Sequence, residues 1–416
     1  MRVLVINTGT ELLLGDVLNT HLSFIAREIF PLGLRVDRQI AVPDGDAIRD
    51  ALSENLERAD LIFVTGGLGP TTDDITREIT AGLLGLELVP DPALAASITE
   101  RLTTRGIRLT NRILRQAQVP RGALILPNDN GSAAGLYLAA GLNGAAAMPH
   151  LFLLPGPPRE LQPMFLQSVL PILQQIVSRE RALAYCNYRI VGMGESYVEE
   201  AVGAELLAIA GLELGYCARM GEVDLRVIGS MEILEQADKI IRGRLENFIF
   251  TTGREDLELV VVRQLAAQKA TLAVAESCTG GFLAHRLTNV PGASEVFLAG
   301  YVTYSNEAKT AALGVTLSTI AEDGAVSEAV ARAMAEGARA KSGATFALAT
   351  TGIAGPGGGS EAKPVGTAFI ALAGGGETVV KHLFFPTDRE TFKQLATQMA
   401  LNLLRDRLTK LAAPSS

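Results

Sequence analysis

Short apolar runs alternate with amphipathic segments over the first part of the chain. Residues Val3–Asn7, Leu61–Thr65 and Leu151–Leu154 form the clearest runs, and each is followed by a turn rich in glycine or proline. Buried strands of a parallel sheet are continuously apolar, whereas surface helices repeat their apolar residues with a helical period. The pattern therefore predicts an α/β domain over residues 1–167, with a parallel sheet wrapped by helices.

The pattern changes in the middle of the chain, over residues 168–253. Strand-like runs and segments of helical periodicity are mixed there, at 188–192, 196–210, 213–216, 222–228 and 231–249. Such a mixture without regular strand and helix alternation is typical of a small α+β domain. We therefore predict a separate α+β domain in the middle of the chain.

Regular alternation of strand and helix returns over residues 254–416. This segment opens with a helical pattern that extends to about Lys269, and Gly374–Gly376 joins two strands that we expect to be antiparallel. The chain has 416 residues, which is more than one hydrophobic core usually supports. The sequence thus predicts an α/β fold class with three domains.

Composition narrows the class of protein. Hydrophobic residues make up 48% and charged residues 20% of the chain, which is enough apolar surface for folded domains. The net charge is -8 without a basic run, so we expect no strong nucleic-acid binding. Three cysteines without metal-ligand spacing argue against disulfides and zinc, and we see no export signal or membrane-spanning segment. We expect a cytoplasmic protein.

Ser277 lies in the turn after a strand-like run, followed by Cys278, Thr279 and two glycines. Amide hydrolysis needs a nucleophile, a proton acceptor and donors for the developing oxyanion. We interpret Ser277 as the nucleophile, with the amide groups of the next helix aimed at an anion or oxyanion. No histidine except His285 lies near this motif, so Lys309, made less basic by desolvation, is the predicted base, together with Tyr304.

Two alternatives apply to this motif. Cys278 competes with Ser277 as the nucleophile, but the sequence places no histidine to form its thiolate. Ser277 and Thr279 can also be explained as helix caps, with the glycines shaping turns. Substitution of Ser277 and of Cys278 by alanine separates these interpretations.

The C-terminal segment resembles the C-terminal domain of CinA-type proteins, and the same motifs occur in stand-alone bacterial nicotinamide mononucleotide amidohydrolases. The motifs that carry the resemblance are Ala275–Gly281, Val290–Ser294, Tyr304–Lys309, Gly324–Ser327, Thr351–Gly359 and Lys363–Thr367. The resemblance implies hydrolysis of nicotinamide mononucleotide to nicotinate mononucleotide and ammonia, without a cofactor. It implies catalytic roles for Ser277, Tyr304, Lys309 and Thr351 and substrate contacts from Thr279, Gly280, Gly281, Asn306, Gly352 and Arg389, the last with the phosphate.

An acidic, glycine-rich motif in the N-terminal domain predicts a second site. Gly66, Gly67 and Gly69 follow a strand, and the adjacent carboxylates Asp73 and Asp74 precede a helix. Backbone amide groups of such a turn can hold a phosphate, while carboxylates bind the divalent cation that neutralises a pyrophosphate. The same residues would also make a good loop and helix start, without catalysis.

This domain resembles the molybdopterin-binding-type domain of the same CinA family. The resemblance rests on Gly9–Gly15, Val64–Thr76, Pro127–Gly135 and Leu154–Glu160. It implies ADP-ribose hydrolysis with a divalent metal ion, which Asp73 and Asp74 would bind. It also implies substrate contacts from Gly66, Gly67, Gly69, Glu11, Asn128 and Glu160.

The middle domain resembles the KH-like domain of CinA proteins, through Val191–Ser196 and Gly221–Val227. A KH loop that binds nucleic acid needs basic residues beside its glycines, but Glu195 follows Gly194 here. We therefore interpret this domain as a scaffold or a dimer contact, and family membership implies a homodimer. Two other functions are left open: a partner protein of competence and recombination, and pterin binding by the N-terminal domain.

Overall fold

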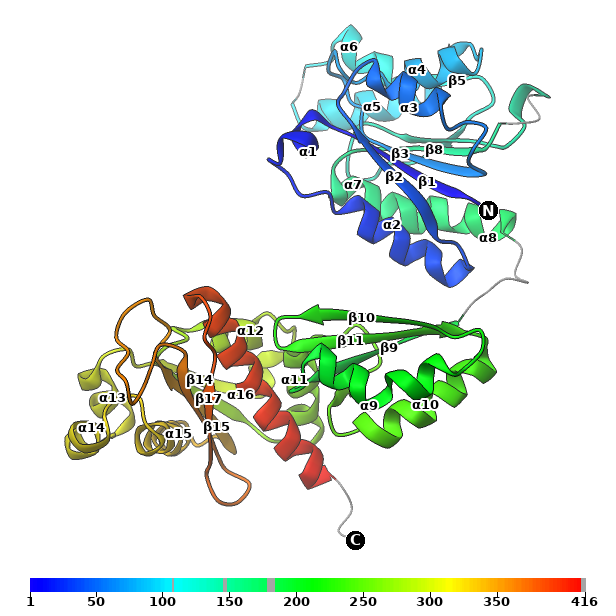
Figure 1. The fold of residues 1–416 in the computed structure, drawn as a ribbon. Coiled ribbons are helices and arrows are strands. Elements are labelled where there is room, and N and C mark those ends of the chain that lie inside the picture. Colours follow the sequence, from blue (N-terminus) through cyan, green and yellow to red (C-terminus); the bar gives the residue numbers. More distant parts are fainter. Residues whose placement is uncertain (107, 145–147, 178–183, 413–416) are drawn as a thin grey trace. The chain divides into compact units, whose positions relative to one another are not determined.

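The computed structural model describes residues 1–412 except 107, 145–147 and 178–183. The chain divides into two compact units, Met1–Leu183 and Ala184–Ser416, and each is described by itself. Figure 1 shows a sheet with helices on both faces in the first unit and two sheets with covering helices in the second. The predicted α/β class is confirmed.

The first unit is built on a six-stranded sheet with the order β2-β1-β3-β8-β7-β6. Four neighbouring strands are parallel, namely β1 (Val3–Thr8), β2 (Val36–Val42), β3 (Leu61–Thr65) and β8 (His150–Leu154). The other two are antiparallel, namely β7 (Gly135–Leu138) and β6 (Leu124–Leu126). The parallel prediction therefore holds for the apolar strands, and a short antiparallel hairpin extends the sheet at one edge.

Helices cover both faces of this sheet (Figure 1). On one face Phe24, Ile25 and Phe165 belong to an apolar cluster with Phe63 and Phe152 of the sheet. The helices and helical turns are α1 (Thr10–Leu14), α2 (His21–Ile29), η1 (Phe30–Leu32), α3 (Ala47–Ser53), α4 (Thr76–Leu83), α5 (Pro92–Thr104), α6 (Asn111–Leu114), η2 (Arg115–Ala117), η3 (Leu142–Gly144), α7 (Pro158–Met164), η4 (Phe165–Val169) and α8 (Leu170–Ile176). A separate two-stranded sheet pairs β4 (Leu88–Pro90) with β5 (Gln118–Pro120).

The second unit begins with a four-stranded sheet with the order β10-β11-β9-β12. Its strands are β9 (Ala184–Val191), β10 (Glu213–Arg219), β11 (Glu222–Gly229) and β12 (Ile249–Thr251), all paired antiparallel. Helices α9 (Glu195–Leu207) and α10 (Met231–Leu245) pack on it through one apolar cluster. The predicted α+β arrangement of this segment is thus observed.

A five-stranded sheet with the order β14-β13-β15-β16-β17 forms the rest of the second unit. Strands β13 (Leu272–Glu276), β14 (Phe297–Val302) and β15 (Phe346–Gly352) are parallel, and β16 (Thr367–Ala373) and β17 (Val379–Phe384) are antiparallel as predicted. Its helices are α11 (Leu257–Ala267), α12 (Phe282–Thr288), η6 (Ala293–Glu295), α13 (Asn306–Leu313), α14 (Leu317–Asp323), α15 (Glu328–Ser342) and α16 (Arg389–Ala412). Two apolar clusters fill its faces, one beneath α11, α12 and α16 and the other beneath α13, α14 and α15.

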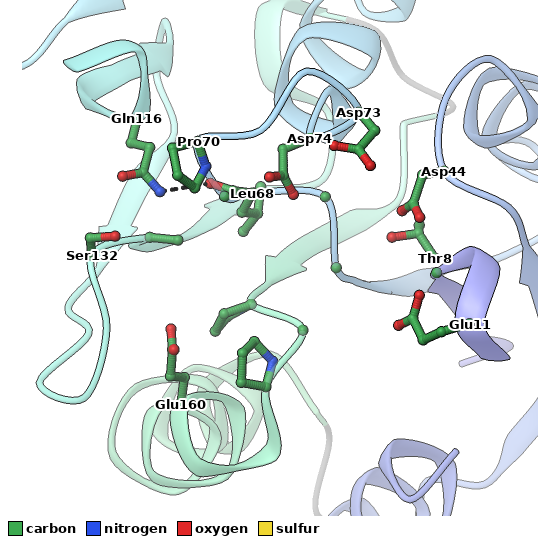
Figure 2. A pocket seen from close by; sticks show the side chains of 18 residues that line it. Thr8, Glu11, Asp44, Leu68, Pro70, Asp73, Asp74, Gln116, Ser132 and Glu160 are labelled. Atoms are coloured by element: carbon green, nitrogen blue, oxygen red, sulfur yellow. Dashed lines mark hydrogen bonds between the residues drawn. The ribbon is translucent and has the colours of Figure 1, made fainter. Parts of the chain in front are cut away.

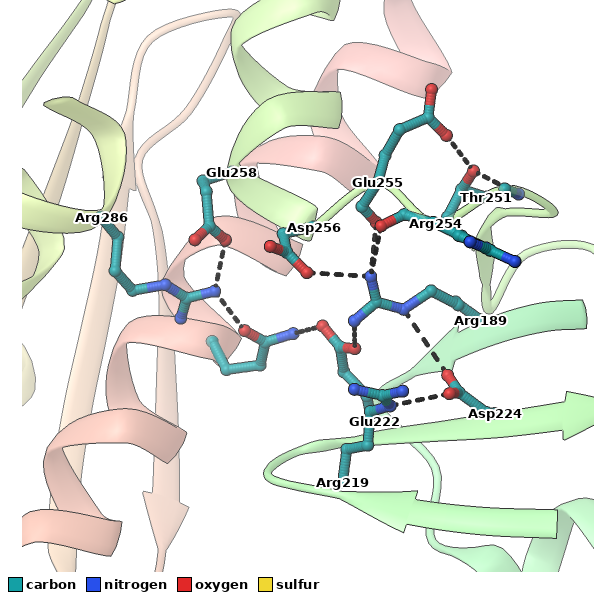
Figure 3. Close-up of polar contacts among 12 residues, drawn as sticks. Arg189, Arg219, Glu222, Asp224, Thr251, Arg254, Glu255, Asp256, Glu258 and Arg286 are labelled. Carbon is teal, nitrogen blue, oxygen red and sulfur yellow. Dashed lines mark hydrogen bonds and ion pairs between the residues drawn. The ribbon is translucent and has the colours of Figure 1, made fainter. Parts of the chain in front are cut away.

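A polar network joins the four-stranded sheet to helices that cover the five-stranded sheet (Figure 3). The guanidinium of Arg189 donates to Glu222 at 2.6 Å and to Asp256, at the start of α11, at 3.0 Å. Glu222 also accepts a hydrogen bond from Gln398 of α16, whose amide oxygen accepts from Arg286 of α12 at 2.6 Å. Residues 184–416 accordingly form one compact unit. The boundaries predicted for separate middle and C-terminal domains stay predictions.

No helix in the described part of the chain has both the length and the apolar composition needed to cross a bilayer.

Candidate functional site

Ser277 and Lys309 lie together at the carboxyl end of the five-stranded sheet. Ser277 directly follows β13, and its amide group donates to the carbonyl of Thr350 in β15 at 2.9 Å. Lys309, on the first turn of α13, has only 1% of its surface exposed. Its Nζ atom lies 3.1 Å from Ser277 Oγ, 3.0 Å from the carbonyl oxygen of Thr303 and 3.3 Å from that of Tyr304. The structure thus brings the predicted nucleophile and base into hydrogen-bond contact.

Burial lowers the pKa of Lys309 from its ordinary value of 10.5, because the apolar surroundings disfavour the ammonium form. A neutral amine has two N–H donors and one lone pair. The carbonyl groups of Thr303 and Tyr304 can accept both donors, which directs the lone pair toward Ser277 Oγ. This arrangement suits removal of the serine proton.

The helix after Ser277 does not offer its amide groups to a substrate, contrary to our prediction. The buried carboxylate of Glu276 accepts hydrogen bonds from the amide groups of Gly281, Leu283 and Ala284 at 2.8–3.0 Å. It also accepts from the hydroxyl of Thr279 at 2.7 Å. An internal carboxylate therefore occupies the start of α12, because it satisfies amide groups that otherwise have no acceptor.

Thr279 is fully buried, with its hydroxyl between Glu276 and Thr350. Its side chain therefore shapes the turn through these two side-chain contacts. The backbone amide groups of Cys278 and Thr279 are still available to a substrate, since neither has a hydrogen-bond acceptor among the residues that the structure describes. Two free amide groups next to a serine nucleophile are a suitable arrangement for an oxyanion.

Cys278 is a poor candidate for the nucleophile. Its side chain is buried, and this burial raises the pKa of its thiol to about 12. Such a thiol stays protonated at neutral pH. His285 is exposed, and its ring stacks on Phe282.

The side chains of Tyr304 and Arg389 are in direct contact on the protein surface, and the backbone carbonyl of Tyr304 accepts from Lys309. The guanidinium of Arg389, at the start of α16, donates to the hydroxyl of Tyr304 at 2.7 Å and to the carbonyl of Gly355 at 3.0 Å. Tyr304 is 61% exposed. The guanidinium and the phenol together present donors to an anionic group outside the protein, such as a phosphate.

The other predicted residues of this site differ in burial. Thr351 is buried, and its hydroxyl donates to the carbonyl of Ala325 at 2.8 Å. Asn306 is exposed at the first position of α13, and Gly280 is exposed in the turn. Gly352 ends β15, where a Cβ atom would collide with Phe392. Thr351 and Gly352 are thus held by contacts with neighbouring segments, and their predicted roles in the site stay predictions.

A cavity of about 360 Å³ lies in the first unit, at the carboxyl ends of β1, β3 and β8 (Figure 2). We call it the acidic pocket, because five carboxylates line it and none of its described lining residues is Lys, Arg or His. The carboxylates are Glu11, Asp44, Asp73, Asp74 and Glu160. Of the predicted residues, Gly66, Gly67 and Gly69 line it too. Asn128 is not a lining residue, but its side-chain amide donates to Glu160 at 2.8 Å.

The glycine turn of the pocket packs closely against Thr8 and Thr76. Gly66 has φ 101°, and a Cβ atom there would collide with Thr8. Gly67 has φ 68°, and a Cβ atom there would collide with Thr76. Both positions need glycine, because other residues rarely adopt this backbone conformation and have no room for a side chain. Asp74 accepts hydrogen bonds from the amide and hydroxyl groups of Thr71, which fixes the end of the turn.

The acidic pocket offers a partial fit to a divalent cation. Among the described residues, no group of three or more Asp, Glu, His or Cys side chains is arranged as a metal site. Magnesium, however, is usually held by one or two carboxylates together with water and the phosphates of its ligand. Adjacent Asp73 and Asp74 suit that mode and do not suit a site made by the protein alone.

Several pocket residues were missing from the sequence prediction, among them Thr8, Asp44, Gln116 and Ser132. Thr8 ends β1, and Asp44 lies two residues beyond the end of β2. Ligands of parallel sheets bind at the carboxyl ends of strands, so this rule could have identified both residues. Gln116 lies in η2 and Ser132 in the loop after β6, and neither follows a parallel strand. Ser132 does belong to the Pro127–Gly135 motif, whereas no pattern in the sequence indicated Gln116.

Comparisons with known proteins agree with this two-part organisation. The family model described as "CinA C-terminal domain" matches residues 254–408, and that described as "Probable molybdopterin binding domain" matches residues 4–175. The chain therefore combines a molybdopterin-binding-like α/β unit with a CinA-type C-terminal part.

A "CinA-like protein" of Akkermansia muciniphila is 45% identical over 408 residues, which cover 98% of this chain and 97% of the relative. A protein of Moorella thermoacetica, whose name gives competence-damage inducible protein as a provisional assignment, is 45% identical over 412 residues, or 97% and 98% of the two chains. A solved CinA superfamily protein from Escherichia coli is 36% identical, with a TM-score of 0.36, and covers 36% of this chain and 88% of that chain. The chain belongs to the CinA family.

Proposed function

We propose that the second unit hydrolyses the carboxamide of nicotinamide mononucleotide to nicotinate mononucleotide and ammonia. The observation that carries the proposal is the contact between Ser277 Oγ and the buried amine of Lys309. A serine paired with a desolvated lysine is a known alternative to the serine and histidine pair of hydrolases. The resemblance of the surrounding motifs to nicotinamide mononucleotide amidohydrolases supports the choice of substrate.

In the first step, Ser277 Oγ attacks the carboxamide carbon while its proton passes to the neutral amine of Lys309. The amide groups of Cys278 and Thr279 donate to the oxyanion that forms. Lys309 then protonates the leaving nitrogen, the C–N bond breaks, and ammonia leaves a nicotinoyl ester on Ser277. A water molecule, deprotonated by Lys309, hydrolyses this ester and releases the carboxylate product.

Arg389 and Tyr304 provide the anchor for the substrate phosphate in this proposal. Their side chains are hydrogen-bonded to each other on the protein surface. Binding energy from a phosphate that does not react can orient the reacting amide. Thr351, Asn306, Gly280, Gly281 and Gly352 shape the site around the ring of the substrate.

The test is ammonia release from nicotinamide mononucleotide by the full chain, with and without a chelator. We expect release in both conditions and its loss in Ser277→Ala. Cys278→Ala is the matched control, since it removes the neighbouring buried side chain and should retain activity. Loss of activity in Cys278→Ala alone would reverse the choice of nucleophile, and absence of release by the unsubstituted chain would refute the proposal.

A second function is proposed for the first unit, which we infer to be hydrolysis of ADP-ribose to AMP and ribose 5-phosphate. The observation that favours it is the acidic pocket, where a positive-φ glycine turn faces five carboxylates. Asp73 and Asp74 would hold a divalent cation, which neutralises the pyrophosphate and polarises it when bound. Glu11, Asp44 and Glu160, which also line the pocket, would orient water and the sugar hydroxyl groups.

This second reaction is tested by AMP formation from ADP-ribose with added magnesium. We expect its loss on chelation and in Asp74→Ala, with unchanged ammonia release from nicotinamide mononucleotide. Full activity in Asp74→Ala would refute the assignment of this carboxylate. The pterin alternative is tested by the melting temperature of the protein with added divalent metal, measured with ADP-ribose and with a pterin. The ligand that binds the folded protein raises this temperature.

Other properties remain proposals. We propose a homodimer in a reducing cytoplasm, with small nucleotides as ligands and no membrane or strong nucleic-acid partner. Measurement of the mass in solution tests the dimer. A role as a partner protein in competence would gain support if both hydrolytic activities were absent.

A further inference from the structure

The glycine-rich loop between β15 and β16, residues 353–366, is held near both ends by a positively charged side chain. Near its start, the carbonyl of Gly355 accepts a hydrogen bond from the guanidinium of Arg389 at 3.0 Å. Near its end, the half-buried Lys363 donates through Nζ to the carbonyl of Asp323 at 2.6 Å. Arg389 is the phosphate anchor of the proposed reaction, whereas Lys363 has had no role in it so far.

The loop is closed at its base and at its tip. At the base, the amide of Gly366 donates to the carbonyl of Ile353 at 2.8 Å, and the amide of Ile353 donates to the carbonyl of Thr367 at 2.8 Å. At the tip, the amide of Lys363 donates to the hydroxyl of Ser360 at 3.1 Å, and the amide of Ser360 donates to the carbonyl of Lys363 at 2.9 Å. The loop therefore has a fixed internal shape, and its contacts with other segments decide where it lies.

Val365 connects the two ends of the loop. It follows Lys363 by two positions, and it packs directly on the loop backbone, since a Cβ atom on Gly355 or on Gly359 would collide with it. Groups in such close contact cannot absorb a displacement and pass it on to their neighbours. A displacement of Lys363 would therefore reach Gly355, whose carbonyl binds Arg389.

The segment that Lys363 contacts is fixed by other parts of the second unit. Asp323 is the last residue of α14, and carbonyl groups at a helix end have no partner within the helix. Two positions further along, the carbonyl of Ala325 accepts from the buried hydroxyl of Thr351 in β15 at 2.8 Å. Lys363 thus ties the glycine-rich loop to a segment that is itself anchored on the five-stranded sheet.

The charge of Lys363 suits this contact for two reasons. A hydrogen bond from an ammonium group is stronger than one from a neutral donor. A positive charge is also favourable at the carboxyl end of a helix, where Asp323 lies. A side chain of similar length without the charge, such as methionine, would leave the carbonyl of Asp323 without this donor.

We propose that Lys363 is a positioning residue of the site in the second unit. Its hydrogen bond to Asp323 holds the glycine-rich loop in place, and the loop orients the guanidinium of Arg389 toward the substrate phosphate through Val365 and Gly355. This inference rests on the proposed hydrolysis of nicotinamide mononucleotide. Because Lys363 acts through Arg389, its loss weakens phosphate binding and leaves the chemical step nearly unchanged.

The test compares two ligands that differ only in the phosphate, nicotinate mononucleotide and nicotinate riboside, by titration calorimetry on the full chain. We expect Lys363→Met to weaken binding of the mononucleotide about fivefold and to leave binding of the riboside unchanged. The KM for nicotinamide mononucleotide should rise in parallel, with kcat nearly unchanged. Lys363→Arg keeps a cationic donor and should retain both affinities. Lys341→Met is the matched control, since Lys341 is exposed in the last turn of α15 and should change neither affinity.

Two further variants test the connection from Lys363 to Arg389. Val365→Ala removes contacts with the loop backbone without removing a charge, so it should weaken binding of the mononucleotide and spare the riboside. In a chain that already carries Arg389→Met, Lys363→Met should have no further effect on the mononucleotide, because the loop then has no guanidinium to orient. Residues that act through one another give such non-additive effects.

Four results would overturn the proposal: unchanged affinity for the mononucleotide in Lys363→Met, equal weakening of both ligands, additive effects of Lys363→Met and Arg389→Met, or no preference for the phosphate in the unsubstituted chain. Failure of the reaction is distinguishable from failure of this inference. Loss of the phosphate preference in Lys363→Met, without ammonia release by the unsubstituted chain, would refute the reaction alone. Ammonia release with an unchanged phosphate preference in Lys363→Met would refute the positioning role alone.

Discussion

The guanidinium of Arg389 donates a 2.7 Å hydrogen bond to the hydroxyl of Tyr304, across 85 positions of the sequence. The phenol oxygen acts as the acceptor, so its own proton is free for another partner. Arg389 also holds the carbonyl of Gly355, which ties the loop after β15 to the same group. The predicted phosphate contact and a predicted catalytic residue therefore form one donor surface.

We expect Arg389→Met to raise the KM for nicotinamide mononucleotide by about tenfold to a hundredfold, because a charge-assisted contact to the phosphate is lost. The kcat should change less. Arg407→Met is the control, since Arg407 lies on the same helix but donates to the carbonyls of Gly374 and Gly375. Steady-state kinetics of both variants give the answer, and an unchanged KM in Arg389→Met would exclude the phosphate contact.

The activity of the second unit should rise with pH through the pKa of Lys309. The neutral amine is the active form, and burial lowers the pKa of this lysine below 10.5. The acidic limb of kcat/KM should therefore lie below the range of an ordinary lysine. Lys309→Met should lose activity at every pH. A profile without any acidic limb would contradict the role of Lys309 as a base.

The free energy of unfolding should also depend on the titration of Lys309. Between the lowered pKa of folded Lys309 and 10.5, the unfolded chain holds a proton that the folded chain has lost. The free energy of unfolding therefore rises with pH across this window, relative to Lys309→Met. Each unit by which the pKa is lowered contributes about 1.4 kcal/mol to this difference. Denaturant unfolding of both chains at several pH values measures it, and parallel pH dependences would show that Lys309 is not desolvated.

The buried network of Figure 3 predicts a large loss of stability in Arg189→Met. Arg189 is the partner of Glu222 and Asp256, and its side chain is 8% exposed. Removal of one member of a buried ion pair typically costs about 3–5 kcal/mol, because the other charge is left unpaired. The exposed pair of Arg244 and Glu205 supplies the control. Arg244→Met should cost less than about 1 kcal/mol in denaturant unfolding, and equal losses would contradict the importance of burial.

The contact of Ser277 with Lys309 could be predicted from sequence because both residues flank adjacent parallel strands. Strands β13 and β14 pair in parallel, and the amide of Thr303 donates to the carbonyl of Glu276 at 2.8 Å. Segments that leave neighbouring parallel strands at the same end necessarily meet. The apolar runs likewise identified three of the four parallel strands of the first unit, β1, β3 and β8, because full burial requires continuous apolar residues. They did not identify β2, an edge strand with mostly exposed residues.

The short hairpin of β6 and β7 and the loop between its strands could not be predicted in this way. Their positions depend on packing between distant segments, as in the contacts of Arg101 with the loop at Asp129–Gly131. The capping of α12 by Glu276 could not be predicted from the sequence either. The sequence shows that helical amide groups follow Ser277, but it does not show that the preceding glutamate turns back to occupy them.

Glu276 leads to the final prediction. Its carboxylate is an acceptor only, and it binds three amide groups of α12 as well as the hydroxyl of Thr279. Glu276→Gln replaces one oxygen by an NH₂ group, which cannot accept from any of these donors. At least one buried donor then loses its partner, at a cost of about 1–3 kcal/mol. The turn that carries the amide groups of Cys278 and Thr279 can relieve this loss only by moving.

Because those amide groups stabilise the oxyanion in the proposed reaction, Glu276→Gln should lower kcat by about 10²-fold, with KM nearly unchanged. Ser230→Ala is the control, since it removes the cap of α10 in the same unit and should cost about 1 kcal/mol without changing kcat. Binding of nicotinate mononucleotide measures whether the ground-state site is intact. A variant with lowered melting temperature but unchanged kcat would show that Glu276 stabilises α12 without positioning the oxyanion donors. Movement of these donors lowers kcat, because they act on the oxyanion that forms during the reaction.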